Sequence, residues 1–277
     1  MKKLITAILV CMVFTLQAQQ NFDKIYTGGK VIECTVKEVT PDAVKYSYPN
    51  EELINTIYKN TITRIEFKSG RVETFSETAT LQTVTSCLDW EKVNVTQLEY
   101  EVKGLFKLGD VSAKAKGATA FSNMNKIKER SIKKLKIQAA MMGGNTLYMT
   151  QLDTKGNVWG NEYTASQSTE TNTSGIAYSN VLPNVQDFEK IVSNNDRFTF
   201  LTKYYLGNSN ADLKNASPAV RQVQITRVYK NQGFIMVNAN IKGEKTDTFR
   251  VTYFDEENVI LMYQDKRKIY NLILKHN

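Results

Sequence analysis

Short runs in which apolar and polar residues alternate recur along most of this chain, and they predict a protein built mainly of antiparallel β-strands. Within residues 22–77 the runs are Ile32–Val36, Val44–Tyr48, Ile65–Phe67 and Val72–Phe75. Turn-forming residues separate or flank them at Gly28-Gly29, Thr40-Pro41-Asp42, Pro49-Asn50 and Ser69-Gly70. Five short strands in so small a span predict an SH3-like or Lsm-like barrel.

The clearest helical periodicity interrupts this pattern in the middle of the chain. It runs from about Ser122, a suitable N-cap, to Gly143-Gly144, a suitable C-terminal stop. At about 100° per residue one side is apolar and the other basic. The apolar arc holds Phe121, Met124, Ile127, Ser131, Ile132, Leu135, Ala139 and Met142, whereas Lys126, Arg130, Lys133, Lys134 and Lys136 lie opposite. Lys128 and Ile137 fall on the wrong sides, so the separation is imperfect.

The final third returns to short strands separated by turn-like segments. The strands expected there are Phe198–Tyr205, Val223–Tyr229, Phe234–Ile241, Thr248–Phe254, Val259–Tyr263 and Tyr270–Leu274. Their regular spacing predicts an antiparallel meander, in the form of a second small barrel or a curved sheet.

The N-terminus has the pattern of a secretory signal peptide. Met1-Lys2-Lys3 is followed by the apolar run Leu4–Leu16 and by Leu16-Gln17-Ala18, which suits cleavage after Ala18. The run is too short to span a bilayer comfortably, and no later apolar run approaches the length of a transmembrane helix. We therefore expect export to the periplasm or cell envelope, or release; an N-terminal membrane anchor is the alternative.

These patterns together predict an α+β fold that is mainly antiparallel β. The expected divisions are the signal peptide 1–18, a small β-barrel-like unit 19–85, an αβ unit 90–181 with its helix at about 122–143, and a β-meander unit 182–277. The 14 Tyr and 12 Phe against 4 Pro suit a folded, β-rich protein.

Two cysteines, Cys34 and Cys87, remain after the signal peptide. In an oxidising envelope they would form a disulfide, or they are two buried free thiols; the sequence leaves both open.

Catalytic and metal chemistry have few candidate residues. The only histidine is His276, one residue from the end, and a nucleophilic site needs an ordered imidazole. The sequence has no HExxH, GxGxxG or GxxxxGK[ST] motif. We therefore expect no catalytic residue, metal or cofactor. An RNA partner, which Lsm-like barrels often have, is not expected of an exported protein.

Two weaker alternatives assign the protein a catalytic activity or a bound small molecule. Asp89 and Glu91 flank Trp90, so a carboxylate-dependent glycan hydrolase is one alternative. The aromatic residues of the C-terminal sheet suggest a carrier of a small apolar ligand, although core packing explains the same residues.

The basic side of the helix is the main functional lead. Its cations Lys126, Arg130, Lys133, Lys134 and Lys136 form a candidate contact surface for an anionic partner or envelope surface. The simpler interpretation is a helix that packs its apolar side on a sheet and keeps its lysines in water.

The segment Ala139–Tyr148, followed by Gly175-Ile176-Ala177-Tyr178, resembles the small αβ envelope domains of the RcsF-like and YbjQ-like families. In these families a helix ends at a Gly-Ala-Asn or similar turn before a sheet strand, so the resemblance, over residues 92–181, implies a fold. RcsF-like domains carry disulfides here and this region has no cysteine, so no shared mechanism is implied. The whole chain also resembles uncharacterised secreted proteins of Gram-negative bacteria. The function we expect is an exported, non-catalytic envelope protein that binds another protein or the envelope surface.

Overall fold

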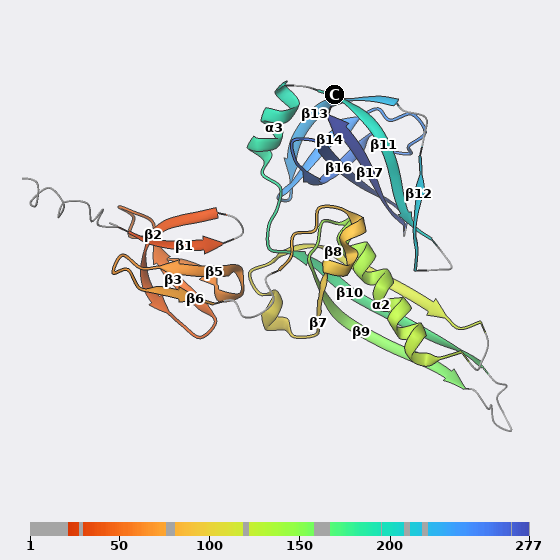
Figure 1. Cartoon of the computed structure of the whole chain (residues 1–277), viewed down its shortest axis with the longest axis horizontal. Coiled ribbons are helices and arrows are strands. Elements are labelled where there is room, and N and C mark those ends of the chain that lie inside the picture. The colour runs from red at the N-terminus through yellow and green to blue at the C-terminus, as the bar shows by residue number, and fades with distance from the viewer. Residues whose placement is uncertain are drawn as a thin grey trace, which may run out of the picture. The chain divides into compact units, whose positions relative to one another are not determined.

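The computed structural model describes residues 22–27, 30–75, 81–118, 122–157, 167–194, 196–207, 211–217, 221–266 and 268–276. The chain divides into two compact units, residues 1–80 and 81–277. The described residues are mainly antiparallel strands in several sheets, which confirms the predicted class (Figure 1). None of the helices among these residues has the length and hydrophobicity that crossing a membrane requires. The predicted signal peptide and Gly28-Gly29 lie outside the described residues.

The first unit is a single sheet in the order β4-β3-β2-β1-β5-β6. Its strands are β1 (Asp23–Thr27), β2 (Lys30–Val39), β3 (Ala43–Ser47), β4 (Asn55–Tyr58), β5 (Ile62–Glu66) and β6 (Val72–Thr74), with the 3₁₀ turn η2 (Lys59–Thr61) before β5. The sheet has one strand more than the sequence predicted. Its core is Ile25, Cys34, Val44, Tyr46, Ile62 and Ile65. Among the described residues no ladder joins β4 to β6, so the predicted SH3-like barrel stays a prediction.

The second unit begins with a four-stranded sheet covered by a helix. Its elements are the 3₁₀ helices η3 (Cys87–Lys92) and η4 (Glu99–Val102), the strands β7 (Asn94–Thr96), β8 (Phe106–Lys116), β9 (Thr146–Asn157) and β10 (Gln167–Ser179), and helix α2 (Met124–Met141). The strand order is β7-β9-β10-β8, and only the short β7–β9 pair is parallel. Helix α2 packs across β8 and β10 (Figure 1).

The C-terminal strands follow one another as the predicted meander, and their ladders close on themselves. They are β11 (Arg197–Leu206), β12 (Leu213–Ala216), β13 (Arg221–Asn231), β14 (Phe234–Ala239), β15 (Thr248–Phe254), β16 (Asn258–Asp265) and β17 (Lys268–His276). Pairing of β11 with β17, from Phe198↔His276 to Tyr205↔Tyr270, joins the two ends. Of the two expected forms, the closed one is therefore present, with β12 outside the closed ring.

Side chains fill the inside of this closed sheet. The largest buried ones are Phe198, Phe200 and Phe249, and Phe188 of helix α3 (Val185–Asn194) packs into the same core. The C-terminal aromatic residues that suggested an apolar-ligand carrier are thus largely core residues.

The two sheets of residues 81–277 are joined by buried polar contacts. Arg250 on β15 donates from Nη1 to the Leu108 carbonyl at 3.1 Å and from Nη2 to the Met142 carbonyl at 3.2 Å. Asn271 on β17 donates to the Met141 carbonyl at 2.8 Å. Burial lowers the pKa of Arg250 to about 10. Residues 90–181 and 182–277, expected as separate units, therefore lie within one compact unit.

Both cysteines are free, buried thiols, and they lie in the cores of different units. Burial, reinforced by Asp23, raises the pKa of Cys34 to about 12. Burial also raises the pKa of Cys87 to about 12. Of the two interpretations that the sequence left open, the structure has the free thiols.

Candidate functional site

Helix α2 begins and ends close to where the sequence predicted. Asn123, one residue after the expected Ser122, is the N-cap, and its side chain accepts from the Lys126 backbone N–H at 3.2 Å. The helix ends at Met141, and Gly143 adopts a φ of +80°. A Cβ at Gly143 would lie 3.0 Å from the Thr252 carbonyl, so both backbone conformation and space favour glycine at this stop.

The apolar arc of α2 packs on the sheet along most of its length. Its buried members are Ile127, Ser131, Leu135, Ala139 and Met142. Met124, at the first turn, is exposed, and Phe121 lies outside the described residues. Ile132, another member of the arc, is only partly buried. Because the rest of the arc covers the sheet, the outer side of α2 is the part available for a partner.

Lys134 is the one predicted contact residue that turns inward. Its side chain is only 5% exposed, and its Nζ donates to the Lys114 carbonyl on β8 at 3.0 Å. Burial, together with Arg130, lowers the pKa of Lys134. A polar seam continues beside it, where the hydroxyls of Ser131 and Thr173 lie 2.7 Å apart. Lys134 therefore helps to seat the helix on the sheet.

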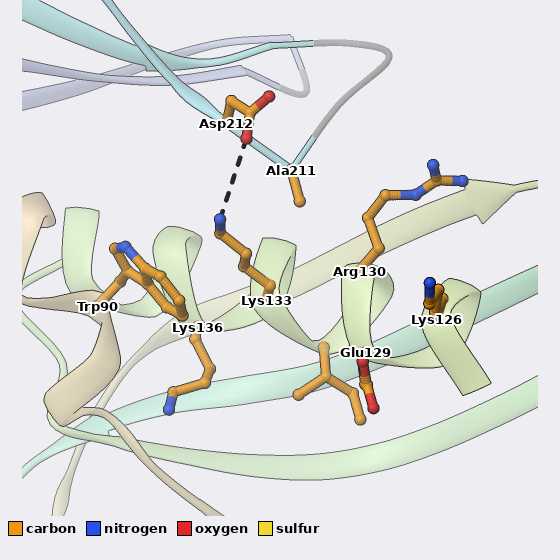
Figure 2. A pocket seen from close by; sticks show the side chains of 9 residues that line it. Trp90, Lys126, Glu129, Arg130, Lys133, Lys136, Ala211 and Asp212 are labelled. Atoms are coloured by element: carbon orange, nitrogen blue, oxygen red, sulfur yellow. Dashed lines mark ion pairs between the residues drawn. The ribbon is translucent and has the colours of Figure 1, made fainter.

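The other four predicted cations line one groove along the outer side of α2. Its volume is about 590 Å³, within the range of ligand-binding sites. It is lined by Trp90, Lys126, Glu129, Arg130, Ile132, Lys133, Lys136, Ala211 and Asp212. Figure 2 shows Ala211 and Asp212 across from α2, and Trp90 at one end. We call this site the α2 groove.

Trp90 is placed by the short helix η3. Ser86 caps that helix, and the carboxylate of Asp89 accepts from the Thr85 and Ser86 backbone N–H groups in a capping box. The indole ring then lies beside two lysines of α2: the Nζ atoms of Lys133 and Lys136 are 4.8 Å and 5.8 Å from its centre. Trp90 thus forms an aromatic wall next to positive charge.

The cations of the groove are held chiefly by neutral carbonyls. Lys136 donates to the Glu91 carbonyl at 2.9 Å, and burial lowers its pKa despite the nearby Glu91 carboxylate. Arg130 donates from Nη2 to the Lys116 carbonyl, while its buried Nε has no hydrogen-bond partner among the described residues. Carbonyls do not neutralise these charges, so an anion entering the groove would gain charge-assisted hydrogen bonds.

Within the described part of the chain, Lys133 alone among these four cations forms an ion pair with an acid, and the pair is loose. Its Nζ lies 3.9 Å from the Asp212 carboxylate, with side chains 37% and 61% exposed (Figure 2). Such exposed pairs contribute little. The groove therefore combines four cations, the two acids Glu129 and Asp212, and an apolar lining of Trp90, Ile132 and Ala211.

The structure brings together Lys126, Arg130, Lys133 and Lys136 and excludes Lys134. Sequence reasoning missed the wall formed by Ala211 and Asp212. No local signal marks it, because it comes from the connection between β11 and β12, far from α2 in the chain. It also did not connect Trp90 with the basic side of the helix.

The two acids beside Trp90 lie in different surroundings. Asp89 accepts at one oxygen from Thr85 and Ser86, and Lys92 lies 2.7 Å from the other. Although burial raises the pKa of Asp89, the hydrogen bonds from Lys92 and Thr85 outweigh it and hold the pKa below its usual value. Glu91 is exposed on a 3₁₀ helix, in which residues two apart do not share a face.

His276 belongs to the aromatic packing of the C-terminal sheet. The His276 ring lies 4.8 Å from the Phe198 ring, and burial lowers its pKa against the opposing effect of Asp255. Within the described ranges, no group of three or more His, Cys, Asp and Glu side chains is placed to hold a metal ion.

A second charged cluster lies on the closed sheet. Lys203 is 2.5 Å from Glu244, and both contact the Tyr263 hydroxyl, which donates to Glu244 at 2.6 Å and lies 2.9 Å from Lys203. Burial and the bond to Glu244 hold the pKa of Tyr263 far above its usual range. The side chains of Lys203 and Glu244 are 18% and 6% exposed, so this cluster is paired and largely closed to solvent.

Comparisons with protein-family models, with curated proteins and with solved structures found no match to this chain. No relative therefore supplies a function, and the resemblance of residues 92–181 to RcsF-like and YbjQ-like domains stays a prediction.

Proposed function

We propose that this chain is an exported, non-catalytic envelope protein that binds an anionic partner in the α2 groove. The observation that carries the proposal is the groove itself, in which four cations surround an apolar lining. The backbone carbonyls that hold Arg130 and Lys136 do not neutralise their charges, so an anion in the groove gains charge-assisted hydrogen bonds.

The shape of the site favours a discrete group over a flat membrane surface. The groove is concave, and the Nζ atoms of Lys133 and Lys136 lie 4.8 Å and 5.8 Å from the centre of the Trp90 ring. The apolar arc of α2 is occupied by the sheet, so contact with lipid would be electrostatic alone and would weaken at moderate salt. An anionic group that enters the groove gains both charge and apolar contact.

The two alternatives receive less support. A glycan hydrolase would need Asp89, whose carboxylate is engaged by Thr85, Ser86 and Lys92. A carrier would need space inside the closed sheet, which the cluster around Phe198, Phe200 and Phe249 occupies. We therefore keep the binding function alone.

Export is part of this proposal, on the strength of the cationic start, apolar run and cleavage pattern of residues 1–18. Intact-mass analysis of exported protein tests it: the expected chain begins at Gln19. A chain that retains residues 1–18 would contradict cleavage, and recovery only from inner membranes would favour an anchor.

We further propose that residues 19–85 form an SH3-like unit that is a second binding surface of the same protein. The order β4-β3-β2-β1-β5, with a 3₁₀ turn before β5, supports this. Its edge strand β4 is preceded by the exposed Leu53 and Ile54, which are suited to contact.

The binding function is tested by titrating mature protein with oligoglutamate and with oligogalacturonate, following Trp90 fluorescence in a Trp159→Phe background. We expect binding at low salt that weakens as salt increases. The double variant Lys133→Gln/Lys136→Gln should bind at least about tenfold more weakly, roughly 1.4 kcal/mol.

The matched control is Lys230→Gln/Lys275→Gln, which removes the same charge from exposed positions outside the groove. It should bind like the parent. If neither anion binds at low salt, or if the control loses as much affinity as the groove variant, the proposal is wrong.

A further inference from the structure

The α2 groove continues into an open strand edge. Asp212, on the groove wall, directly precedes β12 (Leu213–Ala216), and within the described part of the chain β12 has a ladder only with β11. The hairpin of β11 and β12 reaches toward α2 (Figure 1), where Leu206 and Leu213 pack against the core beneath the helix. The groove wall and the edge strand are thus consecutive in the chain.

Nothing among the described elements covers β12. Lys214, Asn215 and Ala216 are all exposed, although their side chains point alternately to the two faces of the strand. An edge strand with free N–H and C=O groups is a template for an additional strand. Proteins that bind extended peptides use such edges for main-chain pairing and adjacent pockets for side-chain specificity.

We propose that the occupant of this surface is an extended acidic segment of a partner protein, which adds a strand to β12 and places its carboxylates in the α2 groove. This rests on the binding function proposed above and names its partner class. A segment paired with β12 that continues past Leu213 reaches the groove at Asp212, because these residues are consecutive.

The positive charges of β12 and of the α2 groove complement an acidic segment. Lys214 adds a cation on β12 to the four that line the groove. Cations at Lys126, Arg130 and Lys133 are three or four residues apart, which is about 4.5–6 Å along a helix. Alternate side chains of an extended peptide are about 7 Å apart, so successive acids can meet successive helical turns.

Asp212 marks where one carboxylate binds. It is a carboxylate already 3.9 Å from Lys133, and it is exposed, so an incoming acid can displace it (Figure 2). A second acid would pair with the guanidinium of Arg130, which lines the groove. Acidic glycans share the carboxylate but have no backbone amides to pair with β12, which is the feature that separates the two partners.

The test uses the mature protein and a labelled peptide of about eight residues in which Glu alternates with Val, followed by fluorescence anisotropy. Two further peptides have N-methyl groups on alternate amides. In one peptide the methylated amides lie along one edge of the extended strand, and in the other they lie along the opposite edge. If the peptide pairs with β12, methylation along the pairing edge should weaken binding at least about tenfold, while methylation along the other edge should not.

Protein variants give an independent measurement. Lys133→Glu should weaken binding of the unmodified peptide at least about tenfold, and Lys230→Glu should leave it unchanged. In an antiparallel pair adjacent residues turn their N–H groups to opposite edges, so one of Lys214→Pro and Asn215→Pro removes an outward donor and should also weaken binding.

Three results would overturn the inference. Equal binding of all three peptides would exclude strand pairing but leave the proposed anion-binding function standing. Tight binding of oligogalacturonate together with no peptide binding would identify an acidic glycan instead. Failure of both anions to bind would remove the proposed function as well.

Discussion

Two clusters of charged side chains in residues 81–277 are built in opposite ways. On the closed sheet, Lys203 lies 2.5 Å from a carboxylate that is almost fully buried, and the Tyr263 hydroxyl completes the cluster. In the α2 groove, Lys133 lies 3.9 Å from an exposed carboxylate, while Lys136 and Arg130 donate to backbone carbonyls. The first cluster satisfies its own charges, and the second leaves positive charge for a partner.

The difference shows why counting charges does not locate a binding surface. Both clusters contain lysines and acids, but only burial and pairing distance decide whether a charge is already used. The same criterion distinguishes Lys134 from the other predicted contact cations of α2. Its side chain is only 5% exposed, whereas theirs line the groove.

The largest expected effect is in the buried cluster. Glu244→Gln leaves the Lys203 ammonium without its carboxylate, and we expect the free energy of unfolding of residues 81–277 to fall by about 3 kcal/mol in urea denaturation. The double variant Lys203→Met/Glu244→Gln should recover much of the loss, because no buried charge then remains unpaired. If Glu244→Gln is as stable as the parent, the Lys203–Glu244 pair does not stabilise the fold, and the proposed difference between the two clusters is wrong.

An intermediate effect is expected at Asp89, an acid beside the groove that serves the fold. Asp89→Ala removes the capping box of η3 and should cost about 1–2 kcal/mol at pH 7. The folded-state pKa of Asp89 is lowered, so its contribution is present above the unfolded value near 3.8 and is lost as pH falls through the lowered value.

The difference in stability between the parent and Asp89→Ala should therefore shrink below about pH 4, as urea denaturation at several pH values would measure. A difference that grows on acidification would contradict the assigned role.

The smallest effect on stability is expected at the groove. Asp212→Asn breaks only the loose, exposed pair with Lys133, so the free energy of unfolding should change by no more than about 0.5 kcal/mol. Binding of oligoglutamate should tighten, because Lys133 loses its internal competitor. A stability loss comparable to that of Glu244→Gln would show that this pair is also structural, and weaker binding would show that Asp212 belongs to the ligand site.

Much of the fold followed from local patterns. Alternation predicted the strands of the first unit and of the C-terminal meander, and the 3.6-residue periodicity predicted α2 with its glycine stop, because hydrophobic period and turn residues act within a few positions. The closure of the meander by β11 and β17 was not predictable in the same way. It depends on pairing between strands about 70 residues apart, for which no single segment carries a signal.

The candidate site, too, has a part that local patterns predict and a part that they do not. The sequence by itself determined a helix with one basic side, including Lys126, Arg130, Lys133 and Lys136, since these positions repeat with the helical period. Only the tertiary structure decided that Trp90, Ala211 and Asp212 turn this side into a groove and that Lys134 is buried. Periodicity sets the direction of a side chain from its own helix, whereas burial and charge pairing depend on what distant segments place beside it.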